Sequence, residues 1–313
     1  MNLLVAMRYL VALDRHGHFG RAAAACHVSQ PALSNALRAL EQEFGVPIVK
    51  RTRTYGGLTP EGEVVLATAR RTLRDIDLLT QDLRGSQAPG GPLRVAAIPT
   101  AMPLLAVFIA LLRERHPGIT PVALAMSSPD IDRGLATLSL DLALGYTERL
   151  RDTSALYTIW PLARERYYLL RRAEGEPANG LRIGHPVPWS DAAKLPLCQL
   201  TPDMHNRAII DAALSSGGSR VEPAIETNSL LTLVLTVSAG AVAGILPGAM
   251  IAAVGDRGEL EALPLVDPEI RAPIGFIALA AARPSRATQA AVELLHDPRW
   301  LALLARHGGE THR

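Results

Sequence analysis

The chain has 313 residues and 48% of them are hydrophobic, which allows two or three compact domains and excludes disorder along the whole chain. The formal net charge is only +2, yet residues 1–90 hold 11 basic and 8 acidic side chains. A basic N-terminal segment on a near-neutral body favours a polyanionic partner at that end. The two cysteines, Cys26 and Cys198, are too few for a disulfide framework or a zinc finger. We therefore expect a protein of the reducing cytoplasm.

Two long uncharged runs raise the question of membrane spans. They cover residues 95–112 and 227–255, and length alone would allow either to cross a bilayer. Prolines interrupt both runs, and the second also holds four glycines. We interpret them as short strands and helices of a buried α/β core. The N-terminus lacks the layout of a signal peptide, and we predict no membrane partner.

In chain order, the first predicted elements are three helices. Apolar residues repeat at helical spacing over Leu3–His16, and Gly17 can end that helix. A short alanine-rich helix follows in residues 19–27. The third helix begins after Ser29, a good N-cap, and ends at Gly45. Its predicted apolar face consists of Leu33, Leu37, Leu40 and Phe44.

The other face of the third helix carries small polar side chains and an arginine, an unusual composition for a solvated surface helix. A short helix, a tight turn and a second helix with an exposed polar N-terminal half form the helix-turn-helix layout, whose second helix enters the major groove of DNA. Short side chains let that helix lie close to the base edges and hydrogen-bond to them. The predicted groove-facing residues are Ser29, Gln30, Pro31, Ser34, Asn35 and Arg38.

Residues 46–60 alternate in strand fashion, and Gly56-Gly57 is predicted to form a hairpin turn. Beside it, Lys50, Arg51 and Arg53 would form a basic wing along the DNA backbone. The alternative is a small helical packing domain with a solvated face. The three helices, the basic wing and a following long helix occur in order, which disfavours that alternative.

A long helix is predicted over Pro60–Ser86, because Thr59, Pro60 and Glu61 are typical of a helix start. Its apolar residues recur at spacings of three and four, as in a coiled-coil seam with one polar interruption at Thr80. An exposed stripe of this kind would aggregate, so we expect a homodimer. The predicted dimer seam is Leu66, Ala69, Leu73, Ile76 and Leu83.

The segment "GSQAPGGP", residues 85–92, reads as a hinge. From Leu93 onward strands and helices alternate, which implies a mostly parallel sheet covered on both faces. Strands are expected over residues 93–99, 120–127, 141–146, 166–172, 195–200, 221–226 and 274–282, and helices over residues 101–116, 129–140, 204–216 and 229–239.

The motifs of common enzyme classes do not occur in the sequence: it has no dinucleotide fingerprint, P-loop, nucleophile elbow or zinc-protease motif. His16 and His18 have no cysteine or acidic partner at metal-ligand spacing. We therefore predict that the chain is not an enzyme, and that it has no catalytic residues, no metal site and no cofactor.

An open parallel sheet binds ligands in the crevice beyond the carboxyl ends of its strands. Hydroxyl side chains gather at these strand ends, and the N-termini of the helices that follow suit a carboxylate or other small anion. Any single Ser or Thr here is more simply a helix cap, and only their common location favours a ligand site. The predicted effector-binding residues are Pro99, Thr100, Ala101, Ser127, Ser128, Tyr146, Thr201 and Pro202.

The stretch "FGRAAAACHVSQPALSNALRALEQEFGVPIVKRT", followed by "LTPEGE", resembles the DNA-binding segment of the LysR-type transcriptional regulators. The stretches "RHPGIT", "DLALGY" and "AGAVAGILP" are similar to recurring parts of that family's effector domain. Asn35 departs from the family pattern, because many members carry a basic residue at this position. The resemblance covers nearly the whole chain.

The resemblance implies an α + α/β protein with a winged helix-turn-helix, a linker helix that pairs subunits and a periplasmic-binding-protein-like effector domain. The winged helix-turn-helix would occupy residues 1–59, the linker helix and hinge 60–90, and the effector domain 91–313, with subdomain I in about 91–162 and 267–313 and subdomain II in about 163–266. The implied partners are double-stranded operator DNA of two-fold symmetry, RNA polymerase for an activator, and further copies of the chain in a tetramer built as a dimer of dimers.

The implied function is transcriptional regulation in response to a small organic acid or other small anion. The segments "AAIPTAMP" and "LTPDMHNR" are similar to regulators associated with formate dehydrogenase operons. Formate is therefore a candidate effector, and formate dehydrogenase genes are candidate targets. The alternative is a small-molecule-binding protein of the periplasmic-binding-protein fold without a DNA role. It would explain the C-terminal body but not the DNA-binding front end.

Overall fold

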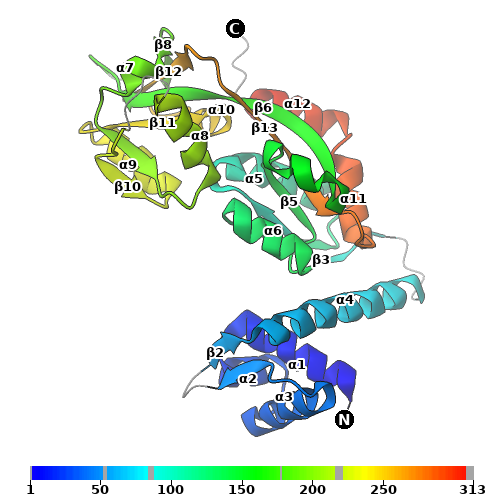
Figure 1. The fold of residues 1–313 in the computed structure, drawn as a ribbon. Coiled ribbons are helices and arrows are strands. Elements are labelled where there is room, and N and C mark those ends of the chain that lie inside the picture. The colour runs from blue at the N-terminus through cyan, green and yellow to red at the C-terminus, as the bar shows by residue number, and fades with distance from the viewer. Residues whose placement is uncertain (1, 52–54, 84–87, 177, 216–220, 308–313) are drawn as a thin grey trace. The chain divides into compact units, whose positions relative to one another are not determined.

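The computed structural model describes residues 2–51, 55–83, 88–176, 178–215 and 221–307, with the helices and strands labelled in Figure 1. The chain divides into two compact units. One contains residues 1–87 and 133–139, and the other contains residues 88–132 and 140–313. We call them the N-terminal and the C-terminal unit, and each has its own hydrophobic core.

The N-terminal unit is a three-helix cluster followed by a two-stranded hairpin and a long helix. Its elements are α1 (Leu3–His16), α2 (Phe19–Ala25), α3 (Gln30–Phe44), β1 (Val49–Arg51), β2 (Tyr55–Leu58) and α4 (Pro60–Leu83). The apolar stripe predicted for α3 is confirmed for its three leucines, which are buried in one cluster with residues of α1, α2 and both strands. It is wrong for Phe44, which is exposed at the end of the helix. The core therefore fixes which face of α3 remains outside.

The capping residues expected from the sequence lie at the starts and ends of these helices. The Ser29 hydroxyl accepts a 3.3 Å hydrogen bond from a backbone N–H in the first turn of α3. Thr59 caps α4 in the same way through the N–H of Gly62, at 2.9 Å. Gly17 and Gly45 follow α1 and α3 in the left-handed conformation, which costs glycine little.

The hairpin turn predicted at Gly56-Gly57 is wrong, because both glycines lie inside β2. In the observed register Val49 faces Leu58 and Arg51 faces Tyr55. This pairing buries Val49 and Leu58 in the core of the N-terminal unit, and that burial outweighs the local turn preference of two glycines. The connection between the strands falls in residues 52–54, outside the described residues.

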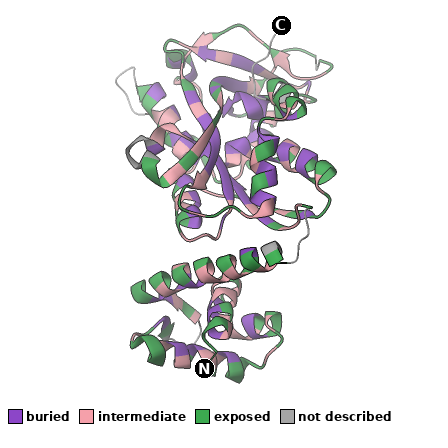
Figure 2. Ribbon diagram, turned by 90° about the vertical axis from the view of Figure 1, so that its right-hand side faces the viewer, coloured by how far each residue is buried: buried purple, intermediate pink, exposed green. Residues whose placement is uncertain are grey.

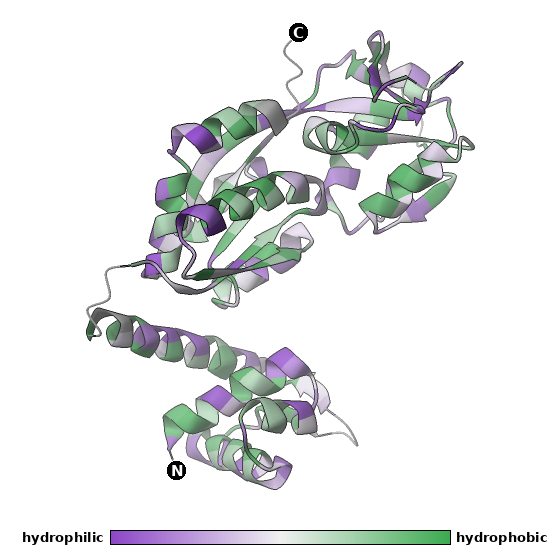
Figure 3. Cartoon of the chain, turned by 180° about the vertical axis from the view of Figure 1, so that it is seen from behind, coloured by the Kyte–Doolittle hydropathy of each residue, from purple (hydrophilic) through white to green (hydrophobic). Residues whose placement is uncertain are grey.

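The predicted seam of α4 is partly used within the chain. Leu66 is buried in the core of the N-terminal unit, and Ala69 is also fully buried. An ion pair between Arg70 and Asp14, at 2.6 Å, ties this part of α4 to α1. Hydrophobic and hydrophilic residues alternate along α4 (Figure 3), and its apolar residues that stay exposed are Val64, Leu79 and Leu83.

The C-terminal unit contains two halves, each with a core of parallel strands. The first half has the order β5-β3-β4, and the second has the order β10-β9-β11. The strands of the first half are β3 (Gly91–Ala97), β4 (Ile119–Ala125) and β5 (Leu142–Tyr146), and those of the second are β9 (Leu197–Leu200), β10 (Ile225–Thr227) and β11 (Ala243–Pro247). Each parallel strand is followed by a helical segment, as the alternating sequence pattern predicts.

Helices cover these strands. Those of the first half are η1 (Pro99–Ala101), α5 (Met102–Arg115), α6 (Ser128–Ala136), η2 (Glu148–Leu156), α11 (Arg286–Leu294) and α12 (Pro298–His307). The last residues of α6, 133–136, are counted with the N-terminal unit in the division given above. Those of the second half are α7 (Trp189–Ala192), α8 (His205–Leu214), α9 (Leu230–Ser238) and α10 (Gly248–Ala253). The buried residues concentrate in the strands and on the inner helix faces (Figure 2).

Two long strands, β6 (Tyr157–Arg172) and β13 (Arg271–Leu279), run antiparallel to each other. In Figure 1, β6 curves from one half of the unit to the other. It pairs with β13 in the first half and with β11 and β12 (Leu260–Val266) in the second, where β12 also pairs with the short strands β7 (Arg182–Ile183) and β8 (Val187–Pro188). The sequence predicted only residues 166–172 of β6.

None of the described helices is long and apolar enough to cross a membrane. The uncharged run 95–112 instead forms the end of β3, η1 and most of α5. The run 227–255 spans α9, β11 and α10. The interpretation of these runs as buried α/β core is confirmed, because their apolar residues include many that are buried.

We predict that Gly62→Ala destabilises the N-terminal unit. A Cβ at this position would lie 2.1 Å from the carbonyl oxygen of Ile48, so α4 would have to move away from the hairpin. The expected loss is about 1–3 kcal/mol of unfolding free energy, measured by urea unfolding. The control is Glu63→Gln, an exposed neighbour on the same helix. A Gly62→Ala loss no larger than that of the control would contradict the prediction.

Candidate functional site

The outer face of α3 is the first candidate site. The predicted groove-facing residues lie together there: Ser34 is half-buried, and Ser29, Gln30, Pro31, Asn35 and Arg38 are exposed. Arg38 donates a 3.0 Å hydrogen bond to the Asn35 side-chain oxygen. This contact holds the guanidinium beside the amide, so the two side chains form one polar surface that can contact bases or phosphates.

The predicted wing is only partly described. Lys50 is exposed on β1, and Arg51 ends that strand. Arg53 lies outside the described residues. Of the three predicted wing residues, Lys50 is therefore the one whose exposed side chain the structure describes.

The second candidate site is a pocket in the C-terminal unit. The space it encloses, together with the solvent at its open mouth, is about 220 Å³, and it is lined by Ile98, Pro99, Thr100, Ser127, Ser128, Tyr146, Leu200, Met204, His205 and Asn206. Five of the predicted effector-binding residues thus line one pocket. Ala101, Thr201 and Pro202 are not among the lining residues, and the second half contributes the end of β9 and the start of α8 instead.

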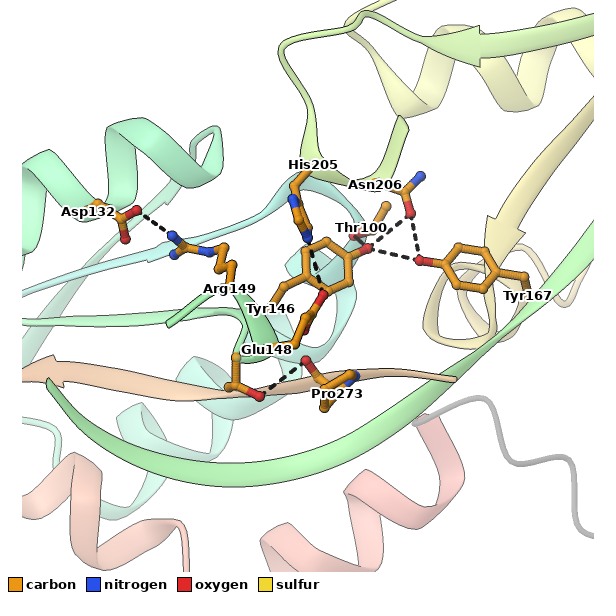
Figure 4. Close-up of polar contacts among 10 residues, drawn as sticks. Thr100, Asp132, Tyr146, Glu148, Arg149, Tyr167, His205, Asn206 and Pro273 are labelled. Carbon is orange, nitrogen blue, oxygen red and sulfur yellow. Dashed lines mark hydrogen bonds and ion pairs between the residues drawn. The ribbon is translucent and has the colours of Figure 1, made fainter. Parts of the chain in front are cut away.

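Tyr146 joins the two halves at this pocket (Figure 4). Its hydroxyl donates to the side-chain oxygen of Asn206 at 2.9 Å and lies 3.4 Å from the hydroxyls of Thr100 and Tyr167. Tyr167, on β6, donates to the same Asn206 oxygen at 3.1 Å. Burial raises the pKa of both phenols, so both remain protonated donors at neutral pH.

A second polar contact also links the halves. The Nε2 atom of His205, at the start of α8, lies 3.2 Å from Oε1 of Glu148, which follows β5. The imidazole also packs on the ring of Tyr146, with 5.1 Å between the ring centroids. Glu148 Oε2 is buried and has no hydrogen-bond partner among the described residues.

Glu165 is a buried carboxyl on the same strand as Tyr167. It lies on β6, is fully buried, and neither carboxyl oxygen has a hydrogen-bond partner in the described part of the chain. Burial, and to a smaller extent the nearby charge of Glu148, together raise the pKa of this carboxyl to about 8. Glu165 is therefore mostly protonated at neutral pH.

Several polar residues of the site were not predicted from the sequence: Glu148, Glu165, Tyr167 and Asn206. The sequence of β6 could have indicated that residues 165 and 167 share a face, because side chains two residues apart in a strand lie on the same side. The partners of this face lie on segments distant in the sequence, and only the strand register brings them together.

Metal binding has no support in the described residues, since no group of three or more His, Cys, Asp or Glu side chains lies close enough to hold an ion. The pocket instead offers hydroxyl, amide and imidazole groups. Ser128 Oγ and Asn206 Nδ2 are buried and have no partner in the described ranges. These atoms can hydrogen-bond to a small polar ligand.

Both parts of the chain match known protein families. Residues 4–63 match the family model of the bacterial regulatory helix-turn-helix protein, lysR family, and residues 86–298 match that of the LysR substrate binding domain. The chain belongs to the LysR family of bacterial transcriptional regulators. It is therefore a DNA-binding transcriptional regulator with an effector-binding domain, and its family is not one of enzymes.

Named relatives of this LysR-type regulator include peroxide-responsive proteins. It is 31% identical over 276 residues to the "DNA-binding transcriptional dual regulator OxyR" of Escherichia coli K12, with 87% of each chain covered. It is 29% identical to the "Hydrogen peroxide-inducible genes activator" of Haemophilus influenzae, covering 84% of this chain and 86% of that one.

Solved structures share the fold of this LysR-type regulator. A full-length cysteine variant of OxyR from Pseudomonas aeruginosa superposes with a TM-score of 0.71 at 26% identity and covers 93% of this chain and 97% of its own. Full-length CbnR in complex with its target DNA gives a TM-score of 0.61 at 21% identity, with coverages of 93% and 98%.

The thiols of this LysR-type regulator lie apart from the pocket. Cys198 is on β9, is fully buried in the apolar core of the second half, and does not line the pocket. Burial raises the pKa of its thiol, so it is poor in reactive thiolate. Cys26 follows α2 in the N-terminal unit, where burial also raises the thiol pKa.

We predict that the free energy of unfolding falls as pH rises, because the buried Glu165 carboxyl resists ionisation in the folded state. Its pKa is about 8 in the folded protein, against 4.5 as its ordinary value. The folded state therefore binds more protons than the unfolded state between these values, and the free energy of unfolding falls by up to about 1.4 kcal/mol per pH unit from pH 5 to 8.

Urea unfolding of wild type and Glu165→Gln at several pH values measures this contribution. The wild type should lose stability relative to Glu165→Gln as pH rises, whereas the exposed control Glu174→Gln should follow the wild type. Parallel pH curves for the wild type and Glu165→Gln would show that the buried carboxyl does not titrate in this range.

Proposed function

We propose that this regulator senses a small organic acid in the pocket of Thr100, Ser128 and Tyr146. One observation carries the proposal: the Tyr146 hydroxyl bonds to Thr100 of the first half and Asn206 of the second, within a buried pocket. A ligand at this place contacts both halves at once. Its binding can therefore change how the halves are held together, which a regulator needs for switching.

The chemistry of the pocket supports a small ligand with a carboxylate or similar anionic group. Three helical segments begin beside it, at Pro99, Ser128 and His205. Helix N-termini favour negative charge by about 0.3–1 kcal/mol each. No Lys or Arg is among the lining residues, so affinity would be modest. Formate is the smallest candidate, and formate dehydrogenase genes are the corresponding candidate targets.

We further propose that the chain does not sense peroxide through a thiol, although relatives carry the name "Hydrogen peroxide-inducible genes activator". Reaction with peroxide requires an accessible thiolate. The chain has only Cys26 and Cys198. Neither lines the pocket, and burial raises the pKa of both thiols. These observations support reversible ligand binding as the sensing chemistry.

The proposed DNA interface consists of the α3 face and the wing, with a two-fold operator read by a homodimer. The dimer is supported by exposed apolar residues on α4, because Leu79 is 55% and Leu83 78% exposed. We propose a tetramer as a dimer of dimers, contact with RNA polymerase if the protein activates, and a cytoplasmic location. The proposed domain limits remain residues 1–59, 60–90 and 91–313.

We predict that Asn35→Ala changes which DNA sequences the protein prefers. Removing the amide deletes a base-contacting group and also frees Arg38, its hydrogen-bond partner. Lys50→Ala should instead weaken binding to all sequences alike and reduce the salt dependence by about one phosphate contact. Selection from a random duplex library measures preference, and anisotropy titrations over a salt series measure the contact number. Unchanged preference in Asn35→Ala would move the recognition surface away from this face of α3.

We predict that Thr100→Val weakens effector binding about tenfold or more, because the variant keeps the shape of the side chain but loses its hydroxyl. A thermal-shift screen of small organic acids, formate included, identifies a ligand for calorimetry. The matched control is Thr120→Val, exposed on β4 and outside the pocket lining. If Thr100→Val binds the identified ligand as tightly as the wild type, the effector site lies elsewhere.

A further inference from the structure

Two tyrosines hold the side-chain amide of Asn206, at the start of α8, in one orientation. Its oxygen Oδ1 accepts a hydrogen bond from Tyr146 at 2.9 Å and another from Tyr167 at 3.1 Å. In Figure 4 both hydroxyls point at this oxygen, and the amide nitrogen lies on the side away from them. The other hydroxyl contacts of this group, between Tyr146 and Thr100 and between the two tyrosines, are 3.4 Å long. The amide oxygen is therefore the best acceptor for both phenol protons, which favours this orientation.

This orientation leaves the amide nitrogen at the free end of the network. Nδ2 is buried and has no hydrogen-bond partner among the described residues, and Asn206 is only 4% exposed. A buried amide nitrogen carries two N–H donors, and such groups normally have partners. Two hydrogen bonds to the oxygen also polarise the amide and strengthen its N–H groups as donors. Because Asn206 lines the pocket, a ligand bound there can supply the missing acceptor.

Ser128 contributes a second such group from the first half. It begins α6, lines the same pocket and is 4% exposed, and its Oγ atom has no partner in the part of the chain that the structure describes. The hydroxyl of its neighbour Ser127 is already used, because it donates to Asp130 at 2.7 Å. Each half therefore brings a buried polar group that lacks a partner to the pocket. A ligand group with two acceptor oxygens offers a partner to each.

We propose that Asn206 determines the ligand specificity of this pocket by donating from Nδ2 to a deprotonated oxygen of the ligand, and that Tyr167 is the positioning residue that orients its amide. Tyr167 itself does not line the pocket. The inference rests on the proposed sensing function and deepens it, because it assigns the group that recognises the ligand. A carboxylate fits Nδ2 because it carries acceptors only. A carboxamide or an amine brings N–H donors to a nitrogen that cannot accept them.

The same contact connects ligand binding to the link between the halves. An acceptor at Nδ2 makes Oδ1 a stronger acceptor for the hydroxyl of Tyr146, because hydrogen bonds on the two ends of an amide polarise each other. Tyr146 belongs to the first half and Asn206 to the second. A bound carboxylate therefore strengthens a hydrogen bond between the halves.

The first experiment compares carboxylates with their neutral amides on the full-length protein at neutral pH, by thermal shift and then by calorimetry. The pairs are formate with formamide, acetate with acetamide, and benzoate with benzamide. We expect at least one carboxylate to bind, with about tenfold or more weaker binding of its amide. Equal or tighter binding of the amides overturns the proposal, and so does the absence of stabilisation by every carboxylate.

The second experiment uses Asn206→Asp, which keeps the size of the side chain and the acceptor for both tyrosines but removes the N–H donors. The dissociation constant of the best carboxylate probe should rise about a hundredfold, and the preference for carboxylate over amide should be lost. The matched control is Asn179→Asp, an exposed asparagine outside the pocket lining, which should change neither quantity. Wild-type affinity for the carboxylate in Asn206→Asp overturns the proposal.

The third experiment uses Tyr167→Phe, which leaves the pocket lining intact. Loss of one donor to Oδ1 lets the amide rotate, and the rotated oxygen repels a carboxylate but accepts an N–H from the matched amide. The ratio of carboxylate to amide affinity should therefore fall about threefold to tenfold, whereas Tyr157→Phe on the same strand should keep the wild-type ratio. A purely structural role would weaken both probes equally, so an unchanged ratio in Tyr167→Phe overturns the positioning role.

These outcomes separate the role of Asn206 from the sensing function itself. If Thr100→Val weakens binding of the carboxylate and Asn206→Asp does not, the sensing pocket stands and only the role of Asn206 falls. If neither variant changes binding, the pocket assignment falls as well.

Discussion

The strands β6 and β13 impose the constraint on which the effector site depends. Each contributes to the ladder that joins the two halves of the C-terminal unit. Because backbone pairing fixes the register of β6, Glu165 and Tyr167 lie on the same face of that strand, where Tyr167 meets Asn206 of the second half. The polar groups of both halves must therefore meet at this place, and any ligand that enters must satisfy the same set of donors and acceptors.

The contacts across the pocket are suited to a change of state. Tyr146 with Asn206, and Glu148 with His205, each link a residue of the first half to one of the second. A net hydrogen bond contributes only about 0.5–1.5 kcal/mol. A small ligand that offers better partners to the unsatisfied oxygens can therefore shift the balance between arrangements of the halves.

Local sequence signals predicted the elements well where the interactions are local. The face of α3 followed from the spacing of its leucines, and the caps at Ser29 and Gly45 followed from residue type. The wing turn depends on packing against another element, so Gly56-Gly57 was misassigned. The start of the predicted α4 seam, Leu66 and Ala69, is buried within the chain itself, which the helical spacing alone does not reveal. At the pocket, Thr100 and Tyr146 were predictable because they end strands. Glu165 and Asn206 required the register of distant strands, which one sequence does not reveal.

A shared fold does not determine the sensing chemistry of a regulator. At about 30% identity the scaffold of helix-turn-helix and two-half effector domain is shared. Sensing chemistry depends on a few side chains, and the polar side chains that line this pocket carry hydroxyls, an amide and an imidazole, while neither thiol lines it. Oxygen and nitrogen groups of this kind can hydrogen-bond to a ligand reversibly. A sensor built on them responds to the concentration of a metabolite, whereas a thiol sensor responds to an oxidant.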